Sequence, residues 1–281
     1  MLTEFIITFR ETLEASLIVG IILAYLAQTH GRKHFQLVFW ATLSAIGASI
    51  LAAAGFQYLA GGFEGIAEEI FEGIVMITAS ILLGSLLIWM MQQKHNTVKL
   101  RASIDKKIHA KHTLGLFALV FFSVFREGIE MVIFLAAAAT AYAEHSLFGS
   151  IAGIASAALL GYLIYIGIKL FNLKHFFTFS TLILLLFGAG LFAHGIHELQ
   201  EAGIFPALID HVWDINPPVH EDGSYPLFHE KGLIGSHLVA LFGYNGNPSL
   251  LEIMGYLLYL GGLYFLSSYL IRKPIIAKGI Q

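Results

Sequence analysis

The chain contains two related charged stretches, Arg10-Glu11-Thr12-Leu13-Glu14 and Arg126-Glu127-Gly128-Ile129-Glu130. Each lies inside an apolar run long enough to cross a bilayer as a helix. Side chains three or four positions apart share a helix face, so Glu11 and Glu14 project together beside Arg10, and the second stretch repeats this arrangement. Charged groups at bilayer depth cost roughly 2.5–3.5 kcal/mol each on insertion scales. Two helices that carry the same costly set of charges therefore indicate a functional site.

The two stretches hold four carboxylates against two guanidinium groups. Ion pairing that only fastens two helices together accounts for each arginine and one glutamate of each stretch. The second glutamate of each stretch has no such partner, and the formal surplus of two negative charges suits a bound cation or a proton. The predicted site comprises Glu11, Glu14, Glu127 and Glu130, with Arg10 and Arg126 as counter-charges.

The composition excludes a soluble protein. Of the 281 residues, 57% are hydrophobic and 12% are charged, and the mean hydropathy is +0.75; soluble chains carry about a quarter charged residues. The length suits one helical bundle in a membrane. Cysteine is absent, which excludes disulfides and thiolate metal sites. Because Arg10 interrupts the first apolar segment, we expect a retained helix there and no signal peptide.

Seven segments reach the roughly 20 residues needed to span a bilayer, so we expect an all-α membrane protein with seven transmembrane helices. The segments are 5–27, 35–60, 66–91, 114–142, 147–168, 176–197 and 250–271. Of the 16 lysines and arginines, all except Arg10, Arg126 and Lys231 fall in the connections after the first, third and fifth segments and in the tail. The positive-inside rule then places the N-terminus outside and the C-terminus inside.

The spacing of the two stretches indicates an internal repeat. Arg10 and Arg126 lie 116 positions apart, each at the start of a block of three helices. An odd number of helices per block reverses the orientation, so the repeat is inverted, as in many secondary transporters. The predicted single polytopic domain, 1–281, divides into a first repeat (1–93), a basic cytoplasmic loop (94–112), a second repeat (113–198), an external acidic loop (199–249) and a seventh helix with a cytoplasmic tail (250–281).

Further acids and histidines gather at the outer ends of the third and sixth helices. Glutamates spaced by four predict one stripe along a helix face, and imidazole beside carboxylate is common metal-ligand chemistry. A solvated helix end or interfacial hydrogen bonding explains the same residues without a metal. The candidate entrance ligands are Glu64, Glu68, Glu69, Glu72, His194, His197 and Glu198.

The external loop is long for a connection, which is typical of a functional or a disordered segment. It carries five of the six prolines and several acids. Apolar runs at 203–212 and 233–242 predict ordered, interfacial short helices that serve as a lid or a docking surface.

These motifs resemble the oxidase-dependent iron permease family, which includes fungal high-affinity iron permeases and the permease subunit of a bacterial iron-uptake system. That family carries Arg-Glu-x-x-Glu, usually Arg-Glu-Gly-Leu-Glu, on the first and fourth of seven helices. The second stretch here matches closely, and the first has Thr12 where glycine is common. The match extends to Glu72-Gly73 and to Phe242-Gly243-Tyr244-Asn245 with Pro248.

The resemblance implies iron import with the four motif glutamates as permeation-site ligands, and iron as transported substrate without a prosthetic group. It also implies a bacterial cytoplasmic (inner) membrane location, with periplasmic or extracellular iron-handling or oxidase partner proteins and no nucleic acid. Hard carboxylate ligands suit manganese and other divalent cations as well. A membrane-embedded di-metal oxidoreductase remains an alternative, although such bundles pair glutamate with histidine as Glu-x-x-His, which neither stretch has. A proton-coupled carrier for an organic substrate would need a larger polar cavity.

Overall fold

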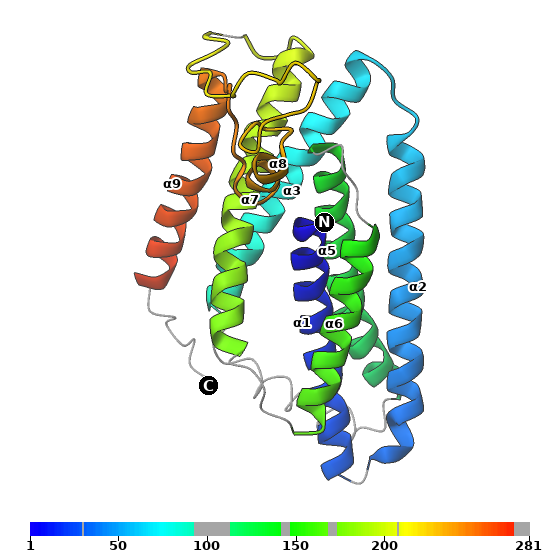
Figure 1. The fold of residues 1–281 in the computed structure, drawn as a ribbon. Helices are drawn as coiled ribbons and strands as arrows, with labels where there is room; N and C mark the ends of the chain where they lie inside the picture. The colour runs from blue at the N-terminus through cyan, green and yellow to red at the C-terminus, as the bar shows by residue number, and fades with distance from the viewer. Residues whose placement is uncertain (30, 93–112, 142–146, 168–172, 207, 273–281) are drawn as a thin grey trace. The chain divides into compact units, whose positions relative to one another are not determined.

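The computed structural model describes residues 1–29, 31–92, 113–141, 147–167, 173–206 and 208–272, and all regular secondary structure within them is helical (Figure 1). The elements are α1 (Leu2–Gln28), η1 (Arg32–His34), α2 (Phe35–Ala60), α3 (Ile66–Gln92), α5 (Thr113–Ala141), α6 (Leu147–Tyr165), α7 (Leu173–Glu201), α8 (Leu233–Phe242) and α9 (Leu250–Arg272). Each of the seven predicted apolar segments corresponds to one long helix. The predicted basic loop 94–112 lies outside the described residues.

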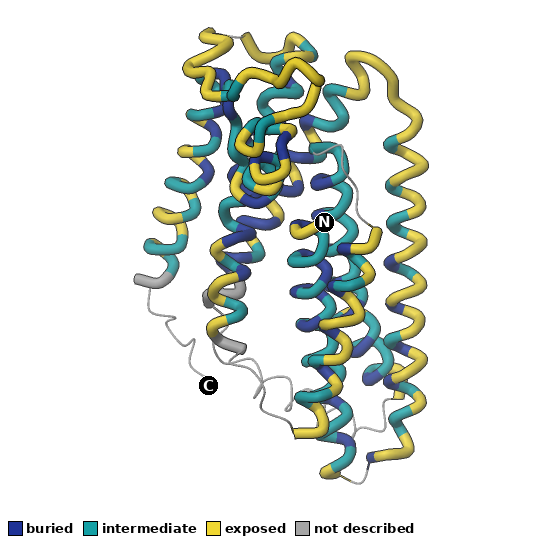
Figure 2. The backbone as a smooth tube through the Cα atoms, in the orientation of Figure 1, coloured by how far each residue is buried: buried dark blue, intermediate teal, exposed yellow. Residues whose placement is uncertain are grey.

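Five of the described helices are long and apolar enough to cross a membrane. Their spans are Arg32–Ala60, Ile66–Ile88, Leu147–Tyr165, His175–Glu201 and Leu250–Leu270. α1 and α5 have similar lengths, 27 and 29 residues, but they carry the charged stretches. Large apolar side chains such as Phe39, Trp40 and Leu51 are exposed along α2 (Figure 2). Such an apolar surface is suited to lipid, in which all backbone groups must be satisfied within the helix.

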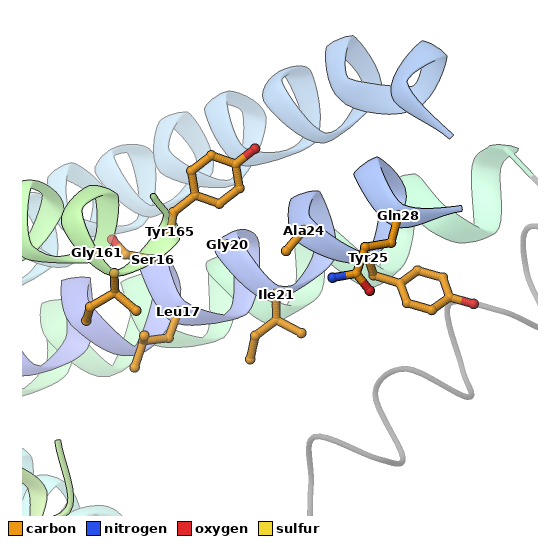
Figure 3. A pocket seen from close by; sticks show the side chains of 10 residues that line it. Ser16, Leu17, Gly20, Ile21, Ala24, Tyr25, Gln28, Gly161 and Tyr165 are labelled. Atoms are coloured by element: carbon orange, nitrogen blue, oxygen red, sulfur yellow. The ribbon is translucent and has the colours of Figure 1, made fainter. Parts of the chain in front are cut away.

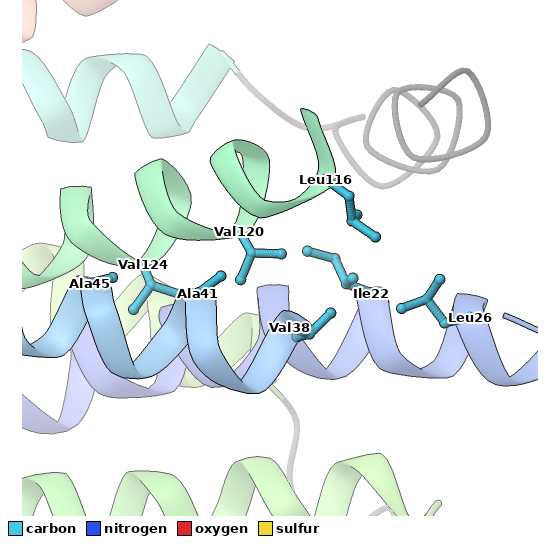
Figure 4. Packing of buried hydrophobic residues seen from close by; sticks show 8 residues of the cluster. All are labelled: Ile22, Leu26, Val38, Ala41, Ala45, Leu116, Val120 and Val124. Carbon is cyan, nitrogen blue, oxygen red and sulfur yellow. The ribbon is translucent and has the colours of Figure 1, made fainter. Parts of the chain in front are cut away.

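The chain forms two compact units, and the first comprises residues 1–72 and 95–182. Within it α1 packs against α6 and α5, while α2 packs against α5. The α1–α6 contact runs in parallel, because Gly153 meets Thr8 and Gly161 meets Ser16 further along both helices. The α2–α5 contact is also parallel. There, an apolar cluster joins the two helices to α1 (Figure 4): Ile22, Leu26, Val38, Ala41, Ala45, Leu116, Val120 and Val124.

Small residues allow these close helix contacts. The buried residues of α2 are Val38, Ala41, Ala45 and Ser49, and those of α6 are Gly149, Gly153, Ala157 and Gly161. Both sets recur every three or four positions and so form one narrow stripe per helix. Stripes of small residues let helix backbones approach closely, which is how transmembrane helices gain packing energy in the absence of a hydrophobic driving force.

The second compact unit comprises residues 73–94 and 183–281. In it α3 and α7 cross at two glycines: a Cβ built on Gly73 would lie 2.9 Å from the Gly195 carbonyl oxygen, and the reverse distance is also 2.9 Å. α9 packs beside them through Tyr259, whose hydroxyl donates to the Ser80 carbonyl at 2.9 Å. Only glycine permits the backbone contact between α3 and α7.

The connection between α7 and α9 is ordered and contains one short helix. The prediction of a helix at 233–242 is confirmed by α8, which ends at Gly243 in the left-handed conformation (φ +65°) beside Gly190 of α7. The prediction of a helix at 203–212 is wrong, since the described residues there form turns and bends. Gly203 has φ +73°, and Pro206 lacks the N–H that a helix interior needs.

Candidate metal site between α1 and α5

The two charged stretches lie inside α1 and α5, which pack against each other in the first unit. Arg10 and Glu11 are fully buried, Glu127 is 5% exposed and Glu130 is 9% exposed. Glu14 is partly buried, with 19% of its side chain exposed. Regular helical spacing therefore brings the charged side chains of both stretches to the region where the two helices meet.

Ion pairs organise the carboxylates within each helix. Arg10 pairs with Glu11 through Nη1 and with Glu14 through Nη2, the latter at 3.0 Å from Oε1, so the expectation that one glutamate of each stretch lacks an ion-pair partner is wrong for the first stretch. Arg126 donates from Nε to Glu130 Oε1 at 2.7 Å. Arg10 also lies within electrostatic range of the glutamates of the other helix. The guanidinium groups thus hold the glutamates in place and offset part of their mutual repulsion.

Three carboxylates from the two helices converge. Glu11, Glu14 and Glu127 each offer one oxygen atom, and these three oxygens all lie within 4.8 Å of one another. A hard cation sits about 2.0–2.6 Å from its oxygen ligands, so ligand oxygens around one ion lie no more than about 5 Å apart. Glu11 Oε2, Glu127 Oε2 and Glu130 Oε2 are buried and have no hydrogen-bond partner among the described residues. The arrangement suits a cation that supplies the missing positive charge.

The glycine of the second stretch has a packing role. A Cβ on Gly128 would collide with the Cβ (2.8 Å) and the hydroxyl of Ser49 on α2. Ser49 donates to the Ala45 carbonyl of its own helix at 2.9 Å. Gly128 therefore lets α2 approach α5 closely beside the charged stretch.

The acidic residues at the start of α3 do not form the predicted stripe of three. Glu64 is exposed and precedes the helix, from which Gly65 with φ +59° separates it. Glu68 and Glu72 lie in α3 four positions apart and share a face. Glu69 is half-buried in the same turn. The predicted helix face thus contains two of the three glutamates spaced by four.

The predicted histidines lie near the end of α7 and pair with acids. His194 Nε2 lies 3.5 Å from Glu198 Oε1, and the rings of His194 and His197 stack at 5.7 Å. His197 contacts two carboxylates, Glu201 through Nε2 at 3.2 Å and Glu252 through Nδ1 at 3.1 Å. Within the described ranges, these residues form no group of three close ligand atoms like that of the charged stretches.

Glu252 is the residue that the sequence interpretation missed. It is 3% exposed at the start of α9 and accepts from the Ser249 N–H at 3.1 Å and from Asn245 Nδ2 at 2.6 Å. Its own N–H donates to Ser249 Oγ, which completes a capping box. The Ser-x-x-Glu spacing was visible in the sequence, but its contact with His197 was not.

The pattern of the iron permease FTR1 family matches residues 1–273 of the chain. The chain belongs to that family. Two proteins named ferrous iron permease EfeU are similar to it: one from Yersinia pestis, 33% identical over 92% of this chain and 90% of its own length, and one from Escherichia coli O6:H1, 31% identical over 92% of each chain. A protein of Archaeoglobus fulgidus that carries no functional name is 31% identical over 94% of each chain. No solved structure matches the chain.

Membership of this family identifies the chain as an integral membrane protein of iron transport and excludes the alternative of a membrane-embedded oxidoreductase. The resemblance to iron permeases is thereby confirmed. Iron is the transported substrate that the family implies.

Proposed function

We propose that the chain imports iron across the cytoplasmic membrane through one site formed by the charged stretches of α1 and α5. The observation that carries this proposal is the convergence of Glu11, Glu14 and Glu127 within 4.8 Å. Intramembrane carboxylates are costly unless they are paired or serve an ion pathway. Glu130, held by Arg126, supplies a fourth carboxylate at the edge of the same site.

The two arginines have a defined role in this proposal. With all four glutamates ionised, the site holds a formal surplus of two negative charges, and a divalent cation balances it. Arg10 and Arg126 keep the empty site from being dominated by carboxylate repulsion, because each pairs with a glutamate of its own helix. A guanidinium fork holds carboxylate oxygens in a fixed geometry without itself becoming a metal ligand.

An inverted repeat of two three-helix blocks, with the N-terminus outside and the C-terminus inside, completes the proposal. The packing supports it: the first helix of each block, α1 or α5, lies parallel to the second helix of the other block, α6 or α2. A two-fold relation between inverted blocks generates such paired contacts. The seven spans then comprise the five apolar helices together with α1 and α5.

The candidate entrance ligands act before this site on the path of the ion. Glu68, Glu72, His194 and His197 would concentrate cations at the entrance by their field, an effect screened by salt. The two relatives named ferrous iron permease favour ferrous iron as the species carried. The bacterial inner membrane, with oxidase or iron-handling proteins on its outer side, is the proposed setting, and the exposed loop after α7 would be their contact surface.

Iron uptake into proteoliposomes tests the proposal, with ferrous and ferric iron offered separately and manganese as competitor. We expect saturable iron uptake, and we expect Glu11→Gln and Glu127→Gln to reduce it at least tenfold because an amide lacks the charge that offsets cation dehydration. Glu4→Gln is the matched control, since Glu4 lies in α1 and pairs with the N-terminal ammonium at 2.6 Å. Near-normal uptake by both glutamine variants of the site would contradict the assignment.

A further inference from the structure

A cavity of about 160 Å³ lies along α1 beyond the charged stretch, between this helix and α6 (Figure 3). Ser16, Gly20, Tyr25 and Gln28 of α1 contribute to its wall. All of its lining residues belong to the first compact unit. None of them belongs to the charged stretches, so the cavity is a separate feature of the same helix pair.

The cavity begins close to the carboxylate site. Leu17, which lines it, follows Glu14 by three positions and therefore shares its helix face. The lining then continues through Gly20 and Ala24 to Gln28, the last residue of α1. At 1.5 Å per residue, the distance along the axis from Glu14 to Gln28 is about 21 Å. The cavity thus follows the face that carries Glu14 towards the end of the helix.

Two helix C-termini lie along the cavity and favour a cation there. Gln28 ends α1 and Tyr165 ends α6, and both residues line the cavity. The two helices run in parallel, and the contact of Gly161 with Ser16 places Tyr165 level with Gly20, so α6 ends beside the middle of the cavity and α1 ends about 12 Å further along. Each helix C-terminus carries roughly half a negative charge from its aligned peptide dipoles. Two such ends beside one cavity attract a positive ion.

The cavity is also large enough for a hydrated ion. One water molecule needs roughly 10–15 Å³ of such volume, so the cavity has room for several water molecules around an ion. Ser16 and Gln28 contribute polar groups to a wall that is otherwise largely apolar. Gly20 leaves part of the wall open, because a Cβ built on it would meet no atom within 4 Å.

We propose that this cavity is a water-filled exit vestibule, through which the cation passes from Glu14 to the C-terminal ends of α1 and α6. The inference rests on the proposed function of the carboxylate site and adds the route of release to it. Gly20 keeps the vestibule open, so a larger side chain at this position obstructs the ion without disturbing the α1–α5 ion pairs.

The absence of cysteine from the chain makes the vestibule accessible to direct chemical test. Gly20→Cys introduces a single thiol into the cavity, Lys33→Cys marks the exposed short helix η1 that follows α1, and Gly47→Cys places a thiol on the exposed apolar face of α2. Each variant is treated with a charged, membrane-impermeant methanethiosulfonate in right-side-out and in inverted vesicles. Iron uptake is then measured before and after modification.

We expect Gly20→Cys to react from the same side as Lys33→Cys, and modification to slow iron uptake at least tenfold. Gly47→Cys should not react from either side and should transport normally. A lipid-filled groove would leave Gly20→Cys unreactive, and that result overturns the proposal. Normal uptake by fully modified Gly20→Cys, in vesicles where the unmodified parent transports iron, overturns the exit route while the proposed function stands. A parent without iron uptake overturns both.

Discussion

Arg10 and Arg126 occupy the same position in the two charged stretches, but their surroundings differ. Arg10 is fully buried and pairs with two glutamates of α1, whereas 39% of the Arg126 side chain is exposed beside Glu130. Arg10 is thus fixed by two carboxylates in a fully buried position, and a hydrogen bond to a buried charge is worth roughly 1.5–3 kcal/mol. The two arginines should therefore respond differently to the same substitution.

We expect Arg10→Lys to lower the maximal rate of iron uptake by about tenfold to a hundredfold, because lysine keeps the charge but loses the fork that pairs with two carboxylates. Arg126→Lys should lower it only a few fold. Initial rates in proteoliposomes, normalised to reconstituted protein, provide the measurement. Equal losses in both variants would mean that exposure does not govern their contribution, and unchanged kinetics in both would reduce the arginines to simple counter-charges.

At the scale of the helices, the contact between Gly128 and Ser49 sets how closely α5 approaches α2. Gly128→Ala should destabilise the protein by about 1–3 kcal/mol, the usual effect of overpacking, since its Cβ would collide with Ser49. The double variant Gly128→Ala with Ser49→Gly should recover stability, because the glycine on α2 then leaves room for the alanine side chain on α5. Thermal unfolding in detergent measures both variants.

Gly47→Ala on the exposed face of α2 is the control for this experiment. A Cβ there meets no atom within 4 Å, so the substitution should be neutral or slightly stabilising. Failure of the Ser49→Gly change to rescue Gly128→Ala would show that the contact with Ser49 does not limit how closely α2 and α5 pack.

Glu252 joins the start of α9 to the end of α7. It accepts hydrogen bonds from Ser249 and Asn245 and contacts His197, and it is almost fully buried. Glu252→Ala should lower the apparent melting temperature by several degrees, because the buried partners lose an acceptor worth about 1–3 kcal/mol. Glu201→Ala is the control, since Glu201 also contacts His197 but its side chain is 56% exposed. Equal shifts in both variants would contradict the assignment of Glu252 as the anchor.

The helices themselves were predictable from the sequence, because a run of about 20 apolar residues has few alternatives in a membrane. The structure differs from the prediction where single residues prevent a helix that the surrounding sequence favours. Gly65 ends the stripe that Glu64 would have continued, and Gly203 with Pro206 prevents a helix at 203–212. The contact of His197 with Glu252 joins residues 55 positions apart, so only the packing of α7 and α9 reveals it.

The charged stretches themselves were evident as a pair of motifs, but which oxygens converge depends on how the helices pack. The sequence predicted all four glutamates of the stretches around one shared site. In the structure Glu11, Glu14 and Glu127 form the close group, and Glu130 is held by Arg126. Periodicity fixes the face of each helix but not the offset between two helices, and this offset decides which three carboxylates meet.

At the scale of the whole molecule, the cross-packing of α1 with α6 and of α2 with α5 brings one charged stretch from each block to a common site. A protein built in this way should bind one ion per chain, because neither stretch alone supplies the group of three oxygens. Removing a ligand from either helix should then disable the same site. The effects of two substitutions that disable the same site are strongly non-additive.

Titration with Mn²⁺, which resists oxidation, measures this stoichiometry in detergent-solubilised protein. We expect one ion per chain for the parent and at least tenfold weaker binding for both Glu11→Gln and Glu127→Gln. The double variant should bind at most a few fold more weakly than the weaker-binding single variant, because either substitution alone already disables the site. Two independent sites predict a different result: two ions per chain in the parent and one full-affinity ion left in each single variant. That outcome would separate the two stretches into two binding sites and remove the shared site on which the import pathway depends.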